Sequence, residues 1–454
     1  MTETLKAPPT DPFIPLLDSL DPEMHEGPTW LTPIRKAGVA GYASSGCPTL
    51  SDEDWRFTNL DPMRSCSFQH PSDSKGISKE AFQSIENPLK DPACIRVVLV
   101  DGIFNETLSD RSLLPEEVCL RSLKQAVQDP ESPLKNHLGQ YTYGNDSPFA
   151  ALNAACFEDG ICLKVPKGVQ LELPIQIMHV TTAQPQASAN FARCWIHMEA
   201  GSKATVMESF HGMDQGVYLS APTLECLVED NAYLEHIKVQ DESKQAFHMA
   251  SIYARITRDA RMDSHHLSLG GRISRNHIRT HLDGPGLCCT LNGLSLAQGD
   301  QIIDHHMVVD HAQPHTESHE YFNGILDDQS RSVFHGRIHV RQVAQKTDAK
   351  QTNKNLLLSD AATADTKPQL EIYADDVRCT HGATIGQLDD QAIWYLRARG
   401  IPMARARRML VHAFAGEIID RIEHPNIRKS LDDLVWEQLE ALPHFHAHTS
   451  TPLS

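Results

Sequence analysis

The stretch Gly168-Val169-Gln170-Leu171-Glu172-Leu173 begins at a turn-forming residue and continues as an alternating apolar and polar run. The same pattern returns at Gly201-Ser202-Lys203-Ala204-Thr205-Val206. Further starts of this kind lie at Asp230, Asp259, Gly286, Gly299 and Asp328. Successive starts are 33, 29, 29, 27, 13 and 29 residues apart. Recurrence at a nearly fixed interval is typical of repeat architectures, in which each unit packs on its neighbours.

The one short interval indicates how many strands a repeat contains. Thirteen residues is about half of the other intervals, as expected if each repeat has two strands and two turns and the pattern usually marks only one turn. Alternation with period two places one face of every strand inside and the other outside. A β-sandwich is the alternative, but its turns usually fall every ~8–12 residues. We therefore predict a mainly β fold with a right-handed, β-helix-like solenoid core.

Changes in composition divide the rest of the chain. Residues 1–145 are rich in Pro, Ser and Asp and predict a mixed, mainly helical N-terminal region, with a helix start at Ser51 and a buried strand over Val97–Phe104 that runs into a turn. The solenoid core is predicted over 146–386. A helical region over 387–443 and a disordered tail over 444–454 follow. Its helices are expected to start near Gln387, Met403 and Ile427.

Composition and charge exclude several classes of protein. The 454 residues carry 41 Lys and Arg against 59 Asp and Glu, a net charge of −18, so a basic nucleic-acid groove is not expected. With 40% hydrophobic and 22% charged residues the composition is that of an ordinary globular protein. No run of 18 apolar residues and no secretory or transit pattern is visible, so we expect no membrane association and a cytoplasmic location.

Eleven cysteines occur without a C-x-x-C pair, which argues against a disulfide framework or a self-contained four-thiolate site. Most lie in apolar strand patterns, where a free cysteine acts as a small hydrophobic residue. No phosphate-binding loop, nucleophile elbow or H-E-x-x-H motif is present, so the chain is not expected to hydrolyse nucleotide itself. The pairs Asp327-Asp328, Asp375-Asp376 and Asp389-Asp390 are interpreted as turn or helix-capping residues.

Histidine is unusually concentrated, with 13 of the 25 lying between His236 and His339. The set His311, His315 and His319 has the spacing of one helical face, which would suit zinc or iron. Pro314 argues against a helix there, and adjacent histidines on a strand point to opposite faces. We interpret these histidines as residues of the solenoid strands and keep metal binding as the alternative.

Cys379 and His381 stand two residues apart in the segment from Tyr373 to Thr384. On a strand they face the same side and offer one thiolate and one imidazole, about half of a tetrahedral metal site. Such a partial set of metal ligands is typical of a site to which a second chain contributes the remaining ligands. The alternative is that both side chains pack in the last repeat before the helices.

Several segments resemble the SufB/SufD family of iron–sulfur cluster assembly proteins, and its SufD branch in particular. They are Glu53-Asp54-Trp55-Arg56-Phe57-Thr58, Leu152-Asn153-Ala154-Ala155, the stretch from Asp375 to Gly386, and Tyr395 to Pro402. The resemblance implies a β-helix with helical ends, in a complex with a SufB-like subunit and a SufC-like ATPase. It implies a non-catalytic scaffold that forms a homodimer when isolated and holds no cofactor alone. In the complex, the resemblance implies a transient iron–sulfur cluster that is shared with SufB, and a site that can bind reduced flavin.

The resemblance also assigns residues. Cys379 and His381 match the positions that face SufB and contact metal there. The C-terminal helices match the part that docks the ATPase, and its candidate contact residues are Leu388, Ile393, Tyr395, Leu396, Arg397, Arg399, Gly400, Leu410, Phe414 and Ile418. Gly382 stands where SufB has a Glu, and the stretch from Gln351 to Asn355 lacks the cysteine of SufB. The chain therefore resembles the accessory half of a shared site.

Two other classes of function stay open on the residues alone. One is a secreted-type β-helix enzyme that acts on polysaccharide, which needs a carboxylate- or basic-lined groove. The other is a homodimeric, histidine-rich metal-binding protein. Stable association with an ATPase supports only the assembly function.

Overall fold

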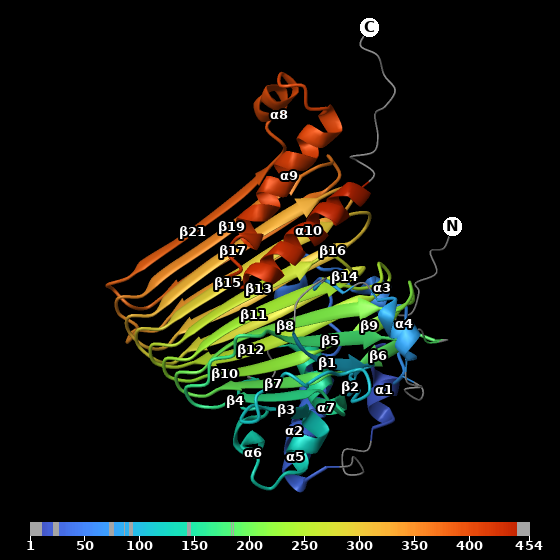
Figure 1. Cartoon of the computed structure of the whole chain (residues 1–454), viewed down its shortest axis with the longest axis vertical. Helices are drawn as coiled ribbons and strands as arrows, with labels where there is room; N and C mark the ends of the chain where they lie inside the picture. Colours follow the sequence, from blue (N-terminus) through green and yellow to red (C-terminus); the bar gives the residue numbers. More distant parts are fainter. Residues whose placement is uncertain are drawn as a thin grey trace.

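Two long β-sheets face each other along the molecule and are joined by turns at both sides, which makes the predicted solenoid (Figure 1). This computed structural model describes residues 11–20, 27–71, 77–85, 87–89, 94–142, 147–182, 184 and 186–442. The predicted tail over 444–454 lies outside the described residues.

From β10 to β21 the chain alternates strictly between the two sheets, so that successive strands belong to opposite sheets. The ten-stranded sheet has the order β2-β1-β5-β8-β11-β13-β15-β17-β19-β21, and the main path of the eleven-stranded sheet is β20-β18-β16-β14-β12-β10-β7-β4-β3, with β6 and β9 beside it. All pairings are parallel except β1 with β2 and β3 with β4. The strands are β1 Ile95–Val100, β2 Ile103–Phe104, β3 Cys119–Ser122, β4 Ile161–Val165, β5 Ile175–Thr181, β6 Ser188–Asn190, β7 Arg193–Met198, β8 Lys203–Gly212, β9 Tyr218–Ser220, β10 Thr223–Val228, β11 Tyr233–Asp241, β12 Phe247–Ile256, β13 Arg261–Ser268, β14 Ile273–Leu282, β15 Cys288–Ala297, β16 Ile302–His311, β17 Glu317–Leu326, β18 Arg331–Val340, β19 Asp348–Leu357, β20 Thr363–Ile372 and β21 Arg378–Gly386.

Stacked turns explain the intervals in the sequence. One turn stack runs through residues with positive φ: Gly168, Gly201, Asn231, Asp259, Gly286, His315 and Lys346. Each of their N–H groups donates to a carbonyl in the next turn of the stack, for example Gly201 to Asp230 at 2.9 Å. Gly299 and Asp328 belong to the opposite turn stack, so the 13-residue interval is one strand, β15, between the two stacks. The prediction of two strands and two turns per coil is confirmed.

The space between the sheets holds the main apolar core. Alternate residues of each strand point inward, such as Leu224 and Cys226 from β10 and Leu234 from β11, and all are buried. Removing one such Leu or Ile side chain from water contributes ~1.5–3 kcal/mol. Because every coil stacks on its neighbours, this core is continuous along the solenoid.

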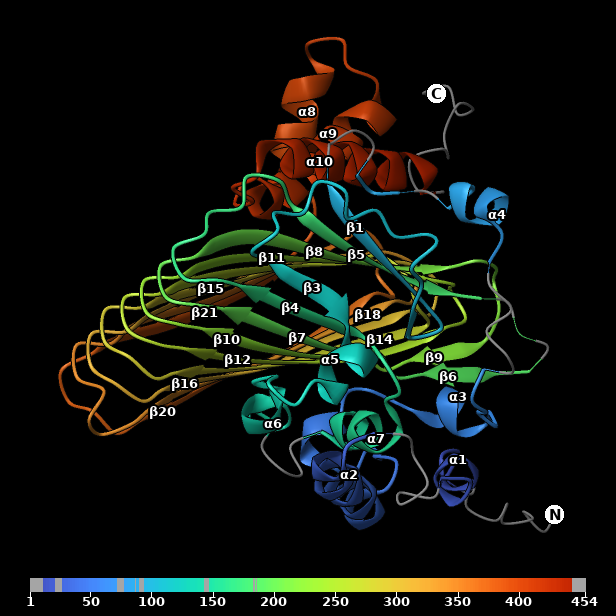
Figure 2. The same ribbon diagram turned by 60° about the horizontal axis from the view of Figure 1, so that its bottom comes forward.

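Most of the N-terminal region packs outside the eleven-stranded sheet, opposite to the C-terminal helices (Figure 2). Ile77, Phe82 and Ile85 instead pack on β1 and β5 of the ten-stranded sheet. Aromatic side chains of this region, among them Phe13, Trp55 and Phe149, pack with Phe247 of β12. Its helices are α1 Ile14–Asp18, η1 Thr29–Leu31, α2 Thr32–Ser45, η2 Glu53–Trp55, α3 Asp61–Arg64, α4 Lys79–Gln83, α5 Leu123–Gln128, α6 Leu134–His137 and α7 Pro148–Cys156.

One local expectation in this region needs correction. The helix expected at Ser51 is only the 3-10 turn η2, and the Ser51 hydroxyl lies 2.6 Å from Thr49 Oγ1 instead of capping a helix. The buried strand expected in the segment from Val97 to Phe104 is β1, and it runs into the expected turn at Asp101 and Gly102, which take positive φ and lead the chain back into β2.

The C-terminal helices α9 Met403–Ile419 and α10 Pro425–Ala441 lie on the outer face of the ten-stranded sheet. Val411 and Ile418 of α9 and Leu431 of α10 pack against sheet residues such as Ile325. The shorter helix α8, Asp390–Arg397, projects past the last strand (Figure 1). Within the described residues, none of the helices has both the length and the apolar character that crossing a bilayer requires.

Candidate functional site

The two ends of the solenoid differ in whether their last strands are covered. At the first end, the antiparallel strands β2 and β3 close the two sheets. At the last end, β20 and β21 are the final strands, and among the described residues no strand pairs with their outer edges. Eight of the nine residues of β21 are exposed. An unpaired strand edge is a template for another strand, so this open end is the natural place for a second chain to bind.

Cys379 and His381 both lie at this open end. In the parallel register, Cys379 pairs with Ala349 and His381 pairs with Gln351. Ala349 and Gln351 are buried inside the coil, so the two candidate ligands share the inward-facing side of β21, as their spacing predicts. Since no further coil covers them, His381 is exposed and Cys379 is half-buried.

The surroundings of Cys379 keep its thiol protonated. It packs against the apolar cluster of Ile338, Val340, Ala344 and Ala349. Burial, with a smaller contribution from the nearby Asp348 carboxylate, raises the pKa of Cys379. The thiol must therefore lose its proton before it can act as a soft metal ligand, and a bound cation would promote that loss.

A buried carboxyl group lies two coils below His381. Glu320 on β17 pairs with Gln351, whose side-chain N–H₂ donates to Glu320 Oε2 at 2.6 Å. Burial raises the pKa of Glu320 to about 7. Glu320, Gln351 and His381 therefore form an inward-facing row that connects a buried carboxyl group of raised pKa with the open end.

Glu320→Gln is expected to change how stability depends on pH. The raised pKa keeps Glu320 protonated in the folded state while the unfolded chain ionises, so in the wild type this group's contribution to stability is full below pH ~4.5 and falls until about pH 7. The variant has no such group, so its free energy of unfolding should rise relative to wild type by up to ~3 kcal/mol between pH 4.5 and 7. Urea unfolding of both proteins at several pH values checks this; a constant difference would contradict it.

Apolar side chains surround the open end. Ile372 and Tyr373 at the end of β20 are 39% and 60% exposed, and Ile385 on β21 is 50% exposed. A solvent-facing group of this kind next to unpaired strand edges is typical of an interface. The geometry can thus hold a partner strand and a shared metal ligand set in the same place.

A second exposed surface lies on α8. Trp394 is 74% exposed and Tyr395 55%, and a groove of about 550 Å³ is lined by Asp390, Ile393, Trp394, Arg397, Ala398 and Met403. Arg399 lies over the Tyr395 ring at 3.4 Å. Exposed aromatic residues beside arginines are the residue types that dominate interface energies. We call this the α8 surface.

The candidate ATPase contact residues differ in their exposure to solvent. Tyr395, Arg397, Arg399 and Gly400 are exposed; Leu388, Leu396, Leu410 and Phe414 are half-buried; Ile393 and Ile418 are buried. The buried pair can position the helices but offers no surface to a partner. Sequence reasoning missed Trp394, because the helical pattern does not tell which apolar residue stays uncovered.

Most buried histidines of the solenoid are hydrogen-bonded inside it. Glu208 binds His179 at 3.1 Å and His236 at 3.0 Å, and His236 binds Ser264 at 2.8 Å. Burial alone raises the pKa of Glu208, but the hydrogen bonds from the two histidines hold it below its usual range. Cys194 lies beside His179 and Glu208, and these three could also hold a metal ion.

Adjacent histidines face opposite sides, as the strand geometry predicts. His305 points inward to Ser295 at 3.1 Å, whereas His306 lies near Asp54 on the outer face. His311 is inside the coil and His315 lies in a turn with positive φ, so the expected helical set does not form. The interpretation of these residues as strand histidines is confirmed for most of them.

The other candidate side chains have structural roles. All eleven cysteines are free, and six are buried. Asp328 takes positive φ in a turn, and Asp389 caps α8 by accepting from the Gln391 N–H at 2.8 Å. Asp376 forms an ion pair with Lys346.

Comparison with known proteins places the chain in a family. The model described as "SUF system FeS cluster assembly, SufBD core domain" matches residues 179–414, which is most of the solenoid and α9. The chain belongs to the SufBD family. The model of the SufBD N-terminal region matches residues 23–177. The family predicted from the sequence motifs is thereby confirmed.

Relatives support a SufBD protein of the SufD type. SufD of Escherichia coli, an iron–sulfur cluster assembly protein, is 31% identical over 85% of this chain and 88% of its own length. A SufBD family protein of Synechocystis is 30% identical over 88% of this chain and 90% of its own. The chloroplastic protein ABCI7 of Arabidopsis thaliana is 28% identical over 92% and 89%.

Proposed function

We propose that this SufBD protein acts as a non-catalytic SufD subunit, which assembles iron–sulfur clusters together with a SufB-like subunit and a SufC-like ATPase in the cytoplasm. The observation that carries the proposal is the open end, where β21 presents Cys379 and His381 beside an unpaired edge of each sheet. The cluster is the cargo of this site, and the chain contributes part of its ligands.

The open end suits a SufB-like partner for two reasons. A strand added to β20 or β21 would continue the backbone hydrogen bonds of either sheet and cover Ile372 and Ile385. One thiol and one imidazole leave a tetrahedral iron incompletely ligated, so the partner must supply the remaining ligands. Without that partner, the same edge would accept a second copy of this chain, which explains the expected homodimer.

The α8 surface suits the ATPase, and α9 connects it to the solenoid. Asn323 of β17 donates to the Phe414 carbonyl at 3.0 Å, and Lys354 of β19 binds Glu417 at 2.7 Å. Arg421 lies over the Tyr321 ring at 3.5 Å. A displacement of α9 is thus passed to the coils next to the open end. ATP-driven closure can act on the cluster site only if the closed and open ATPase bind these helices with different affinity.

Substitution of the exposed aromatic pair should weaken ATPase binding. Trp394→Ala with Tyr395→Ala removes two side chains of the kind that form interface hot spots, so we expect at least a tenfold higher Kd for the SufC-like protein. Lys429→Ala, at an exposed position of α10, is the control and should bind normally. Surface plasmon resonance with the immobilised ATPase measures both. Equal Kd values for the aromatic variant and wild type would remove α8 from the interface.

The proposal as a whole is tested by co-expression with the SufB-like and SufC-like proteins of the same organism. We expect one complex that contains all three chains and, after anaerobic supply of iron and sulfide, transfers a cluster to an apo-ferredoxin. Alone, the chain should elute as a dimer in size-exclusion chromatography with light scattering. Failure to co-purify with either partner overturns the proposal.

A further inference from the structure

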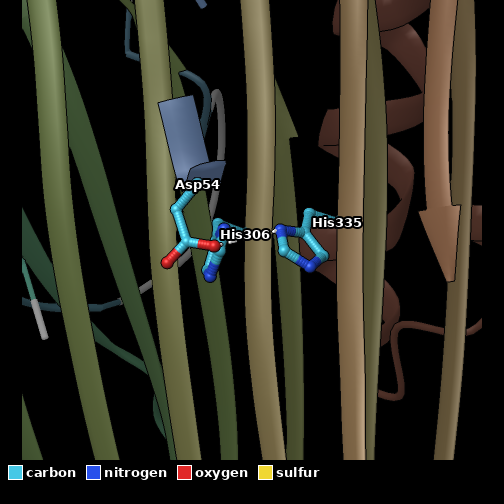
Figure 3. Close-up of side chains that lie close together, drawn as sticks. All are labelled: Asp54, His306 and His335. Carbon is cyan, nitrogen blue, oxygen red and sulfur yellow. Dashed lines mark ion pairs between the residues drawn. The ribbon is translucent and has the colours of Figure 1, made fainter. Parts of the chain in front are cut away.

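A second cluster of metal-ligating side chains lies outside the open end. His306 of β16 and His335 of β18 are partners in the parallel register, and both point to the outer face of the eleven-stranded sheet. Asp54 of η2 reaches them from the N-terminal region (Figure 3). One ligand atom of each residue lies within 4.8 Å of the others. Asp54 precedes His306 by 252 positions and His335 by 281 in the sequence, so only the fold brings it to the two histidines.

The surroundings of the two imidazoles show which ring nitrogens are open to a ligand. His306 is 3% exposed, and its Nδ1 has no hydrogen-bond partner among the described residues. His335 Nε2 lies 3.1 Å from Gln369 Oε1, an acceptor, so the proton of the neutral ring is on Nε2. The lone pair of His335 Nδ1 then faces Asp54 Oδ1 at 3.7 Å. Two acceptors facing each other are stabilised by a cation between them.

The neighbouring charges leave Asp54 available to such a cation. Arg275 pairs with Asp304, Arg337 with Glu371 at 3.6 Å, and Lys367 with Glu53 at 2.7 Å. Burial, together with the positive charges of Arg275 and Arg337, holds the pKa of His306 well below its usual value, and burial lowers that of His335.

The backbone that carries Asp54 is held by the sheet, while its side chain borders solvent. Arg275 donates to the Asp54 carbonyl at 2.9 Å and lies over the Trp55 ring at 3.8 Å. Thr58 donates to Asp304 at 2.6 Å. The Asp54 side chain itself is 45% exposed. Ligand atoms bound at ~2.1 Å to one ion are at most about 4.2 Å apart, so a small rotation of this carboxylate completes the site.

We propose that Asp54, His306 and His335 bind one divalent transition-metal ion, Zn²⁺ or Fe²⁺, which ties η2 to the outer face of the solenoid. Two imidazoles and one carboxylate suit these borderline ions, and Gln369 orients His335 as an outer hydrogen-bond partner. Because Asp54 borders solvent, the ion keeps open coordination positions. This site is independent of the proposed function and lies on the outer face of the sheet, whereas Cys379 and His381 face the interior at the open end.

The test uses the full-length chain with Cys379→Ser and His381→Ala, so that binding at the open end does not contribute. Anaerobic calorimetric titration with Zn²⁺ and, separately, Fe²⁺ should find one ion per chain at this site, apart from any ion that His179, Cys194 and Glu208 bind in the interior. His306→Gln, His335→Gln and Asp54→Asn should each raise the Kd at least tenfold. His339→Gln is the matched control, because His339 lies on the same strand and face but pairs with Glu371. Binding of Zn²⁺ alone or Fe²⁺ alone identifies the ion.

A second measurement separates loss of the site from loss of folding. Bound metal should slow amide hydrogen exchange in residues 53–58 of the parent chain and leave the Asp54→Asn chain unchanged, since an exposed carboxylate is not needed for folding. The proposal is overturned if the parent binds neither ion below 1 mM, or if the three variants bind as tightly as the His339→Gln control.

Discussion

Replacing His381 with Ala should lower the rate of cluster assembly about 10–100-fold while the proposed complex with a SufB-like and a SufC-like subunit stays intact. The imidazole is exposed on β21, so its loss should change the free energy of unfolding by no more than ~0.5 kcal/mol. Its inward-facing position above Gln351 is where a partner's ligands would meet it. The measurement is cluster transfer from the reconstituted complex to an apo-ferredoxin, followed by circular dichroism.

Thr380→Ala is the control for this substitution. Thr380 is also exposed on β21, but it points to the opposite side of the strand. The control should assemble clusters at the wild-type rate and co-purify equally well. If the His381→Ala complex matches it, the imidazole takes no part in assembly, although the open end could still bind the partner.

Glu225→Ala should cause the largest loss of stability, about 3–5 kcal/mol. Glu225 and Arg193 form a fully buried ion pair between β10 and β7. The carboxylate also accepts from the Gly139 N–H at 2.9 Å, and Arg193 donates to Asn153 of α7 at 3.1 Å. The substitution leaves the guanidinium buried without its counter-ion and removes the hydrogen bond that joins Gly139 of the N-terminal region to β10.

The matched control is Glu199→Ala. Glu199 pairs with Lys164 at 2.7 Å on the same part of the solenoid, but the two side chains are 26% and 34% exposed. A partly exposed pair contributes ~0–1 kcal/mol. Urea unfolding followed by far-ultraviolet circular dichroism should therefore show a much lower midpoint for Glu225→Ala than for Glu199→Ala. Similar midpoints would mean that water or another group compensates Arg193.

The solenoid was predictable because its geometry constrains individual residues. A turn that must repeat in every coil selects residues that tolerate positive φ, and Gly201 and Asp259 reveal these turns. Period-two alternation then follows from a core that lies on one side of each strand. The same alternation placed Cys379 and His381 on one face. Their exposure did not follow from it, because it depends on the absence of a further coil.

What could not be predicted depends on contacts between distant segments. Asp54 reads as part of a helix start, and His306 as one of many strand histidines, until the N-terminal region packs on the sheet. Likewise, Ser51 has the residue type of a helix cap, but Thr49 binds its hydroxyl. The partners of the interior Glu208 come from strands on either side of it, at distances in sequence that no local pattern reports.

The hydrogen bonds between stacked turns also limit which insertions and deletions such a chain can accept during evolution. Each coil meets only the coil before and the coil after it, and its turn donates one backbone hydrogen bond onward, as Asn231 does to Arg258. Duplication or loss of one entire coil would preserve pairing, while insertion of a single residue within a strand would exchange its inner and outer faces. Evolution of this architecture should therefore proceed in steps of whole coils, with small insertions confined to the corners.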